Sequence, residues 1–115
     1  MSSIFTNSVW QFRFTLTDPA TNTPYSLAGK TLEMHFKAVP GGPKLIGATT
    51  ANGKLIVSGT SSNQLDVSLL ETDTALLSAG VVRFDVLWTN YNGSKPLRLF
   101  GGRIPVKTGI TISGG

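Results

Sequence analysis

The sequence predicts an all-β fold, an antiparallel immunoglobulin-like β-sandwich of about seven or eight strands with at most one short helical turn. A partly open β-barrel is the alternative. Three observations lead to this prediction. Short segments alternate apolar and polar residues with the period of two that marks a half-buried strand. Turns rich in glycine, proline and asparagine separate these segments at fairly regular spacing. The length of 115 residues is that of one domain, so we expect residues 1–115 to form a single β-sandwich.

The composition is apolar enough for a core and unusually poor in charge. Hydrophobic residues make up 40% and charged residues 14% of the chain, which argues against disorder. A surface built largely from uncharged polar residues suits stable assembly. The chain has no cysteine, so disulfides and thiolate chemistry are excluded. The N-terminal residues lack the basic segment and apolar run of a signal peptide, and no apolar run approaches the ~20 residues that cross a bilayer. We therefore expect synthesis in the cytoplasm, no classical export and no membrane partner.

The formal charge of +4 raises the question of nucleic-acid binding. The ten basic residues are, however, spread along the whole chain, without any run of lysine or arginine and without a helix to carry one. They are Arg13, Lys30, Lys37, Lys44, Lys54, Arg83, Lys95, Arg98, Arg103 and Lys107. Scattered basic residues are typical of a solvated surface, so no nucleic-acid partner is expected.

The first third of the chain predicts two strands joined by a loop. Residues 9–16 alternate apolar residues with polar ones, and residues 31–38 do the same. The apolar members are Trp10, Phe12, Phe14 and Leu16 in the first strand, and Leu32, Met34, Phe36 and Ala38 in the second. Between them, Asp18-Pro19 opens a loop dense in turn formers. Leu27, and with it Tyr25, is expected to tuck back as a short edge segment.

The middle of the chain predicts a hairpin, a strand and a helical turn. Residues 44–50 and 54–58 flank Asn52-Gly53, and Asn-Gly between two strand-like segments is a strong hairpin signal. Residues 64–69 form the next strand, with Leu65, Val67 and Leu69 on one face. Residues 70–79 are the only plausible helix, in which Asp73 would cap a single turn carrying Leu76 and Leu77, and Gly80 would end it.

Residues 80–89 predict the central strand of the fold. Val82, Phe84, Val86 and Trp88 share one face, and Val81, Arg83, Asp85 and Leu87 share the other. The charged pair on this second face is expected to meet a neighbouring strand or a partner. A turn follows at residues 90–93, and residues 96–100 and 103–106 continue the strand pattern on either side of Gly101-Gly102, which predicts a bulge or bend.

The residues with catalytic potential do not form a recognisable constellation. His35 is the only histidine and alternates with Glu33 and Lys37, as a surface residue would, so neither a zinc site nor a catalytic triad is expected. Asp66 and Asp85 could lie on neighbouring strands, but a glycosidase pair needs two carboxyls across a cleft, and their surroundings are those of ordinary sheet. The sequence therefore predicts a protein that is not an enzyme and has no metal or cofactor.

The aromatic residues outside the core offer an alternative function. Trp10 and Trp88 fall in phase with apolar faces and are expected in the core, while Tyr91 lies in a turn and is expected to be exposed. Tyr25 and Tyr91 are the candidate ligand contacts of a carbohydrate-binding or host-adhesion module.

The order of the elements resembles a family of small β-sandwich domains encoded among the tail and baseplate genes of tailed bacteriophages and prophages, with the N-terminal domain of baseplate upper proteins as the nearest type. The likeness runs from about residue 12 to residue 111 and involves turns, glycines and alternating apolar residues. It is carried by Thr17-Asp18-Pro19, by Pro24-Tyr25-Ser26-Leu27-Ala28-Gly29-Lys30-Thr31, by Met34-His35-Phe36-Lys37, by Asn52-Gly53, by the segment 76–85, by Gly102-Arg103-Ile104-Pro105-Val106 and by Gly109-Ile110-Thr111.

The resemblance implies a structural, non-enzymatic virion protein that acts through protein–protein assembly in the tail, baseplate or head. It implies a homo-oligomer, with a trimer as one option, together with other virion proteins as partners, and a location in the virion after synthesis in the bacterial host. Such domains usually head longer proteins, so a stand-alone virion protein and a domain that works with another chain both stay open. Candidate interface residues are Leu99, Phe100, Ile110 and Ile112, for which core and terminal packing is the alternative role.

Overall fold

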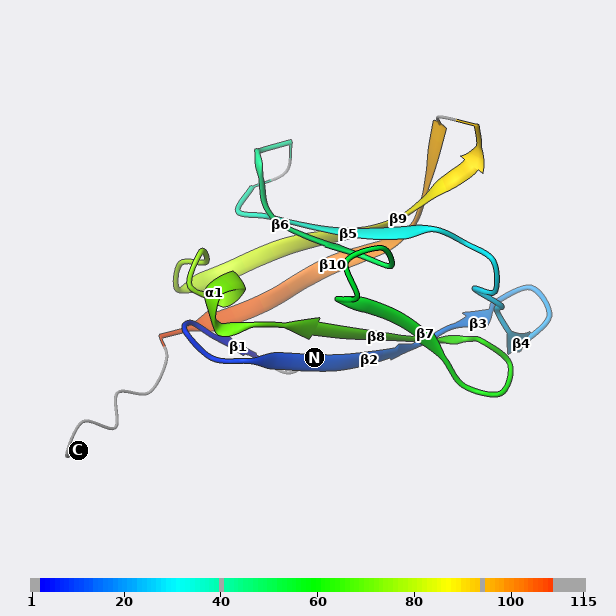
Figure 1. The fold of residues 1–115 in the computed structure, drawn as a ribbon, viewed down its shortest axis with the longest axis horizontal. Coiled ribbons are helices and arrows are strands. Elements are labelled where there is room, and N and C mark those ends of the chain that lie inside the picture. Colours follow the sequence, from blue (N-terminus) through cyan, green and yellow to red (C-terminus); the bar gives the residue numbers. More distant parts are fainter. Residues whose placement is uncertain (1–2, 40, 94, 109–115) are drawn as a thin grey trace.

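The computed structural model describes residues 3–39, 41–93 and 95–108, and it confirms the predicted all-β sandwich (Figure 1). One layer is a five-stranded sheet, called sheet A, with the order β1 (Ile4–Phe5), β10 (Lys95–Lys107), β9 (Gly80–Asn92), β5 (Leu32–Lys37) and β6 (Lys44–Thr49). The other is a three-stranded sheet, called sheet B, with the order β2 (Trp10–Thr15), β8 (Gln64–Leu69) and β7 (Leu55–Ser58). A small ribbon pairs β3 (Thr17–Asp18) with β4 (Thr23–Pro24), and α1 (Glu71–Thr74) closes one end. All strand pairs are antiparallel except β1 with β10.

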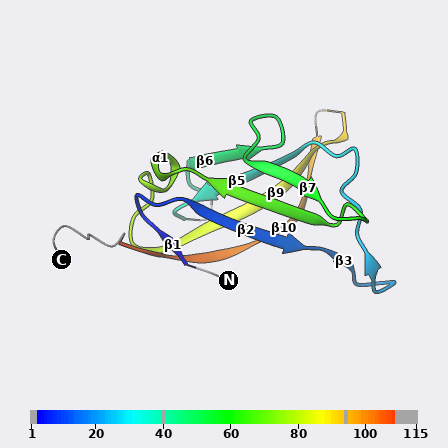
Figure 2. The same ribbon diagram turned by 60° about the horizontal axis from the view of Figure 1, so that its bottom comes forward.

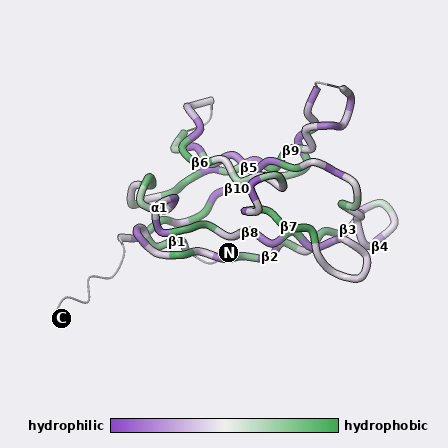
Figure 3. The backbone as a smooth tube through the Cα atoms, in the orientation of Figure 1, coloured by the Kyte–Doolittle hydropathy of each residue, from purple (hydrophilic) through white to green (hydrophobic). Residues whose placement is uncertain are grey.

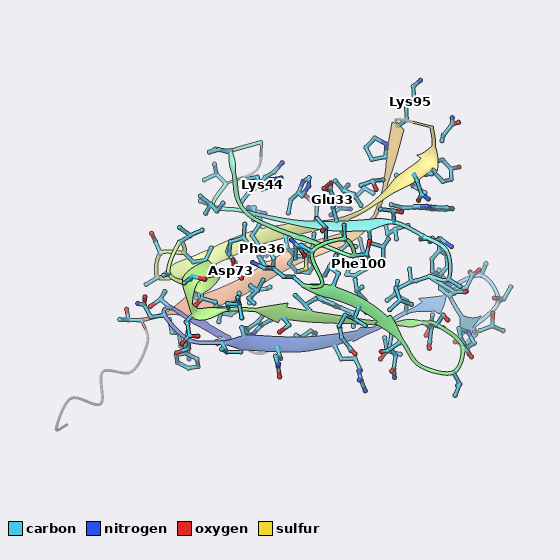
Figure 4. All side chains as sticks on the ribbon, viewed as in Figure 1. Glu33, Phe36, Lys44, Asp73, Lys95 and Phe100 are labelled. Atoms are coloured by element: carbon cyan, nitrogen blue, oxygen red, sulfur yellow. The ribbon has the colours of Figure 1, made fainter. Side chains whose placement is uncertain are left out.

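The core lies between the two sheets and is filled by the apolar residues that alternate along the strands. Its buried members include Trp10, Leu32, Met34, Phe36, Leu55, Leu65, Val67, Leu69, Val82, Phe84, Val86 and Ile104. Figure 4 shows Phe36 from sheet A pointing into this interior, while Glu33 and Lys44 project from the opposite face of the same sheet. Period-two patterning therefore predicted the core face correctly for both sheets. Ala38 is an exception, because it lies past the end of β5 and is exposed.

The predicted Asn-Gly hairpin is wrong. β6 pairs with β5 in sheet A, whereas β7 pairs with β8 in sheet B, so the turn carries the chain from one layer to the other. Gly53 has a φ of +80°, but Asn52 is not among the residues with positive φ, and a two-residue hairpin turn of type I′ needs both. Instead, the Asn52 side chain accepts hydrogen bonds from the backbone N–H groups of Thr49 and Lys54, each at 3.0 Å. The turn residues were identified correctly and the pairing of the flanking strands was not.

The strand predicted at residues 80–89 is the centre of sheet A, as expected, but it is longer. β9 runs to Asn92 and pairs with both β5 and β10. The predicted turn is therefore shortened to the tip around Gly93, and this hairpin rises above the sheet (Figure 1). Figure 3 colours much of its tip as hydrophilic.

The bulge predicted at Gly101-Gly102 lies elsewhere. Both glycines stay in register with β9. The two irregularities in this pairing fall between Lys95 and Leu97 and between Arg98 and Phe100, the second at Leu99. Gly101 is required for another reason: a Cβ atom there would come within 2.5 Å of the Phe84 carbonyl oxygen on β9. The glycine therefore allows a close approach of two strands, which is a second common use of glycine in a sheet.

The helix is a single turn, as predicted, with different ends. Leu70 is its N-cap residue and Ala75 its C-cap residue, so Gly80 does not end it and begins β9 instead. Asp73 lies inside the turn and accepts a hydrogen bond from the Leu70 N–H at 2.9 Å. Leu77 is buried beyond the helix, whereas Leu76 is 59% exposed.

The segment after β4 does not form the expected edge strand. Leu27 is 1% exposed, and its backbone N–H donates to the carbonyl oxygen of Ser62. Tyr25 is half-buried against the core, and its N–H donates to Leu16. The segment therefore covers one end of the sandwich as irregular chain.

Candidate functional site

One side of the sandwich is left open by two unpaired strand edges. β2 is the outer strand of sheet B, and β1 covers β10 only at Val106 and Lys107 among the residues the structure describes. Figure 2 shows β2 and β10 on the same side of the molecule. The Phe14 and Phe100 rings connect the two strands, with centroids 5.1 Å apart. Unpaired edges and aromatic rings are thus brought to the same side of the molecule.

An apolar hollow opens at this seam. It has a volume of about 410 Å³ and is lined by Phe14, Thr15, Leu16, Thr17, Pro19, Tyr25, Leu99 and Phe100. Phe14 lies at the centre of a ring cluster, because its centroid is also 4.9 Å from that of Phe12 and 5.5 Å from that of Phe84. The rings make the surface of the hollow apolar, and such a hollow suits an apolar side chain of a partner.

Leu99 and Phe100, proposed from sequence as interface residues, both line this hollow. Both are also half-buried and pack against the core, so each contributes to core packing and to the surface. The bulge at Leu99 places two consecutive residues of β10 at the same hollow, which strict alternation along a strand would not allow. The other two candidates, Ile110 and Ile112, lie outside the described residues.

The two candidate ligand-binding tyrosines converge on a second cluster. The Lys30 ammonium lies 4.4 Å from the centre of the Trp88 ring and 5.3 Å from that of Tyr25. Trp88 also meets Tyr91 edge-on, with centroids 4.8 Å apart. Tyr91 is 51% exposed, as predicted. We call Tyr25, Lys30, Trp88 and Tyr91 the aromatic–lysine cluster.

The two tryptophans differ in environment. Trp10 is 5% exposed and belongs to the core, as predicted. Trp88 is only half-buried: it packs on the core from the rim of sheet A, and its Nε1 donates to Asn90 at 2.6 Å. Lys30, which covers the Trp88 ring, was not recognised from the sequence, because nothing local relates Lys30 to a strand so far along the chain.

The acidic residues do not form a catalytic arrangement. The placement of Asp66 and Asp85 on neighbouring strands is wrong, since Asp66 is on β8 in sheet B and Asp85 on β9 in sheet A. Each faces outward and bonds an arginine of its own sheet: Asp66 bonds Arg13 at 2.7 Å, and Asp85 bonds Arg98 at 2.6 Å. Asp85 therefore meets a neighbouring strand, as expected. In the described part of the chain, no group of three or more histidine, cysteine or acidic residues is arranged to hold a metal ion.

His35 lies on the outer face of sheet A. It is directly opposite Asp85 of β9, and its Nε2 is 3.4 Å from a Glu33 carboxylate oxygen on its own strand. Its side chain is 20% exposed, less than a free surface residue would be.

Two carboxylates have pKa values below their usual range. The hydrogen bond from Arg13 lowers the pKa of Asp66 most, against the opposing effect of partial burial, and Ser58 adds a further bond. Burial raises the pKa of Asp73, but bonds from Lys54 and from the Leu70 N–H outweigh it, so the net pKa is lowered. Both carboxylates are ionised at neutral pH and serve structural links.

No protein-family model matches the chain, and no curated protein matches it significantly. Among the described residues, no helix is long and apolar enough to span a membrane.

Proposed function

We propose that this chain is a non-enzymatic structural protein of a tailed bacteriophage or prophage particle, acting in the tail, baseplate or head through protein–protein assembly as a homo-oligomer. The observation that supports this best is the apolar hollow between the free edges of β2 and β10, where Leu99 and Phe100 reach the surface. The phage origin rests on the family resemblance of the sequence.

The hollow has the features of an assembly contact. Apolar and aromatic side chains form its floor, while uncharged Thr15, Thr17 and Pro19 form its exposed rim. Interfaces commonly combine an apolar centre with a polar rim. Flanking strand edges add backbone donors and acceptors that a second chain can pair with.

The test places charge on the rim without touching the core. Thr15→Lys and Thr17→Lys each put an ammonium group beside the hollow, and Thr60→Lys, at an exposed turn, is the matched control. The masses of the wild type and variants are measured by size-exclusion chromatography with light scattering over a range of protein concentrations. Purified particles are assayed for the chain by mass spectrometry.

We expect the wild type to assemble into multiples of its 12.2 kDa mass, the two rim variants to shift toward monomer, and the control to behave as the wild type. A wild type that is monomeric at every concentration and is missing from particles would rule the proposal out. If all three variants still assemble, the hollow is not the assembly contact.

Carbohydrate binding is the second candidate function, as part of host adhesion. The supporting observation is the convergence of Tyr25 and Tyr91 on Lys30 and Trp88, since aromatic faces beside polar groups are a common sugar platform. The test is a glycan array with the wild type and Tyr91→Ala, which removes a half-exposed ring and leaves the core intact. Loss of binding in the variant would support this function, and a wild type that binds no glycan would rule it out.

A further inference from the structure

Three cationic side chains stand abreast on the outer face of sheet A. In the strand register, Lys37 of β5 lies opposite Arg83 of β9, and Arg83 lies opposite Arg103 of β10. Each alternates with a buried residue and therefore points away from the core. With about 4.8 Å between strands, the row is about 10 Å long. We call these three residues the cationic row.

The charges of the cationic row are not neutralised within the described structure. The ion pairs of the described residues are those of Arg13, Lys54 and Arg98, and neither these nor the close contact of His35 with Glu33 includes a member of the row. Like charges directly opposite each other on paired strands destabilise a sheet. An anion bound to the row would offset this repulsion between like charges, which explains the arrangement.

A hollow lies over the row. It has a volume of about 360 Å³ and is lined by all three members together with Arg98, while Val39 and Gly41 of the loop after β5 form one wall. Asp85 also lines it, but its carboxylate is held by Arg98 Nε at 2.6 Å. The figures show this loop rising above the outer face of sheet A (Figure 1), and Lys44, which follows it, projecting from the same face (Figure 4).

We propose that this hollow is a binding site for a compact, multivalent oxyanion, that is, a ligand with two or more phosphate or carboxylate groups. Arginine provides planar paired donors for such groups and lysine a point charge. A row of about 10 Å spans more than one anionic group. The inference does not depend on the proposed assembly role, since it concerns another face of the molecule.

The surroundings of the row favour a compact ligand over a nucleic-acid strand. On one side, the next residues along the strands are His35 and Asp85, followed by Glu33. On the other side lie Val81 and Pro105, which are opposite each other. Along β5 and β9 the charges of the row are thus followed by acidic or uncharged residues, whereas a nucleic-acid backbone needs a continuous basic track.

The test compares the wild type with Arg83→Gln, which removes the central charge, and with Lys95→Gln as a matched control. Lys95 is an exposed cation at the tip of the β9–β10 hairpin, outside the hollow (Figure 4). Inorganic tripolyphosphate and citrate are titrated by calorimetry at low ionic strength in a buffer free of phosphate. A hexaglutamate peptide is titrated as well, to test whether the anionic groups come from an acidic protein segment or from a free small anion.

We expect the wild type and Lys95→Gln to bind tripolyphosphate with the same affinity. Arg83→Gln should bind it at least about tenfold more weakly, the change expected for the loss of one charge-assisted contact. Tripolyphosphate should also raise the melting temperature of the wild type but not of Arg83→Gln. Without anion, Arg83→Gln should melt no lower than the wild type, because it relieves like-charge repulsion, and this separates lost binding from lost folding. Tighter binding of citrate or hexaglutamate than of tripolyphosphate would assign carboxylates as the ligand groups. Equal binding by all three proteins, no binding by any, or binding of duplex DNA alone would overturn the proposal.

Discussion

The link between Lys54 and Asp73 gives the sharpest prediction about stability. Lys54 Nζ donates to both carboxylate oxygens of Asp73, at 2.6 and 2.7 Å, and the Leu70 N–H donates to one of them at 2.9 Å. The side chains are only 25% and 13% exposed. This link ties the turn before β7 to α1, so we expect Asp73→Asn to destabilise the fold while keeping its shape.

The size of the effect follows from the bonds that an amide cannot replace. Asparagine keeps one acceptor oxygen and turns an NH₂ group toward Lys54, and in one of its two orientations toward the Leu70 N–H as well, although both are donors. Losing a hydrogen bond to a charged group costs about 1.5–3 kcal/mol, so we expect the free energy of unfolding to fall by about 2 kcal/mol at pH 7. For a domain of this length, that lowers the melting temperature by about 8 °C.

The pH dependence has a definite sign. Because the folded-state pKa of Asp73 lies below its unfolded value, the native state binds fewer protons, and the carboxylate stabilises the fold above the unfolded pKa of about 3.9. This contribution is lost as the pH falls through the lowered folded-state pKa. The wild type and Asp73→Asn should therefore differ at pH 7 and converge in strong acid.

Urea unfolding followed by circular dichroism at pH 7, 5, 4 and 2.5 measures this difference. Asp18→Asn is the control, since among the described residues the Asp18 side chain accepts only the exposed Ala20 N–H, at the end of β3, and the change should alter stability by less than about 0.5 kcal/mol. A constant difference between the wild type and Asp73→Asn across the pH series, or no difference at pH 7, would refute the role assigned to the carboxylate.

Three further substitutions test local features of the fold by the same unfolding measurement. Gly101→Ala should cost about 2 kcal/mol or more, because its Cβ would lie 2.5 Å from the Phe84 carbonyl oxygen and force β9 and β10 apart. Thr74→Val should cost about 1–3 kcal/mol, because the buried Thr74 hydroxyl bonds both the N–H and the carbonyl oxygen of Ser8, at 3.0 and 2.8 Å. Asn52→Ala should cost about 1–2 kcal/mol, because its side chain holds the turn that carries the chain between the sheets.

Each of these variants has a matched control elsewhere in the chain. Gly47→Ala adds a methyl group that meets only the flexible end of Lys44, and Thr60→Val alters an exposed turn. Asn92→Ala, at the exposed end of β9, removes an amide that makes no side-chain hydrogen bond to another residue in the described part of the chain. If a control costs as much as its partner, the specific contact is not the cause.

Several features of the fold could be predicted because they depend on neighbours in the sequence. Alternation of apolar residues is a local pattern, and it placed β2, β5, β8 and β9 with the correct core faces. The exposure of Tyr91 and the burial of Trp10 follow from the same local signals. The residues that favour turns are also a local signal, so most turns were predicted at the correct positions.

The pairing of strands was less accessible, because it depends on long-range contacts. Asn52-Gly53 has the residues of a hairpin turn, yet the two flanking strands lie in different sheets, since β6 pairs with β5 and β7 pairs with β8. The position of the bulge at Leu99 follows from register with β9, which a strand's own residues do not reveal. The placement of Asp66 and Asp85 was wrong for the same reason.

The all-β class, the faces of the main strands and the composition of the core can be read from the sequence alone, since each follows from a period of two within one segment. The residues that share a surface are known only from the folded chain. Lys37, Arg83 and Arg103 stand abreast, Tyr25 and Tyr91 converge on Lys30 and Trp88, and Leu99 and Phe100 line one hollow with Phe14. Strand order and register are selected by burial summed over both sheets, which is a property of the whole chain and not of any single segment.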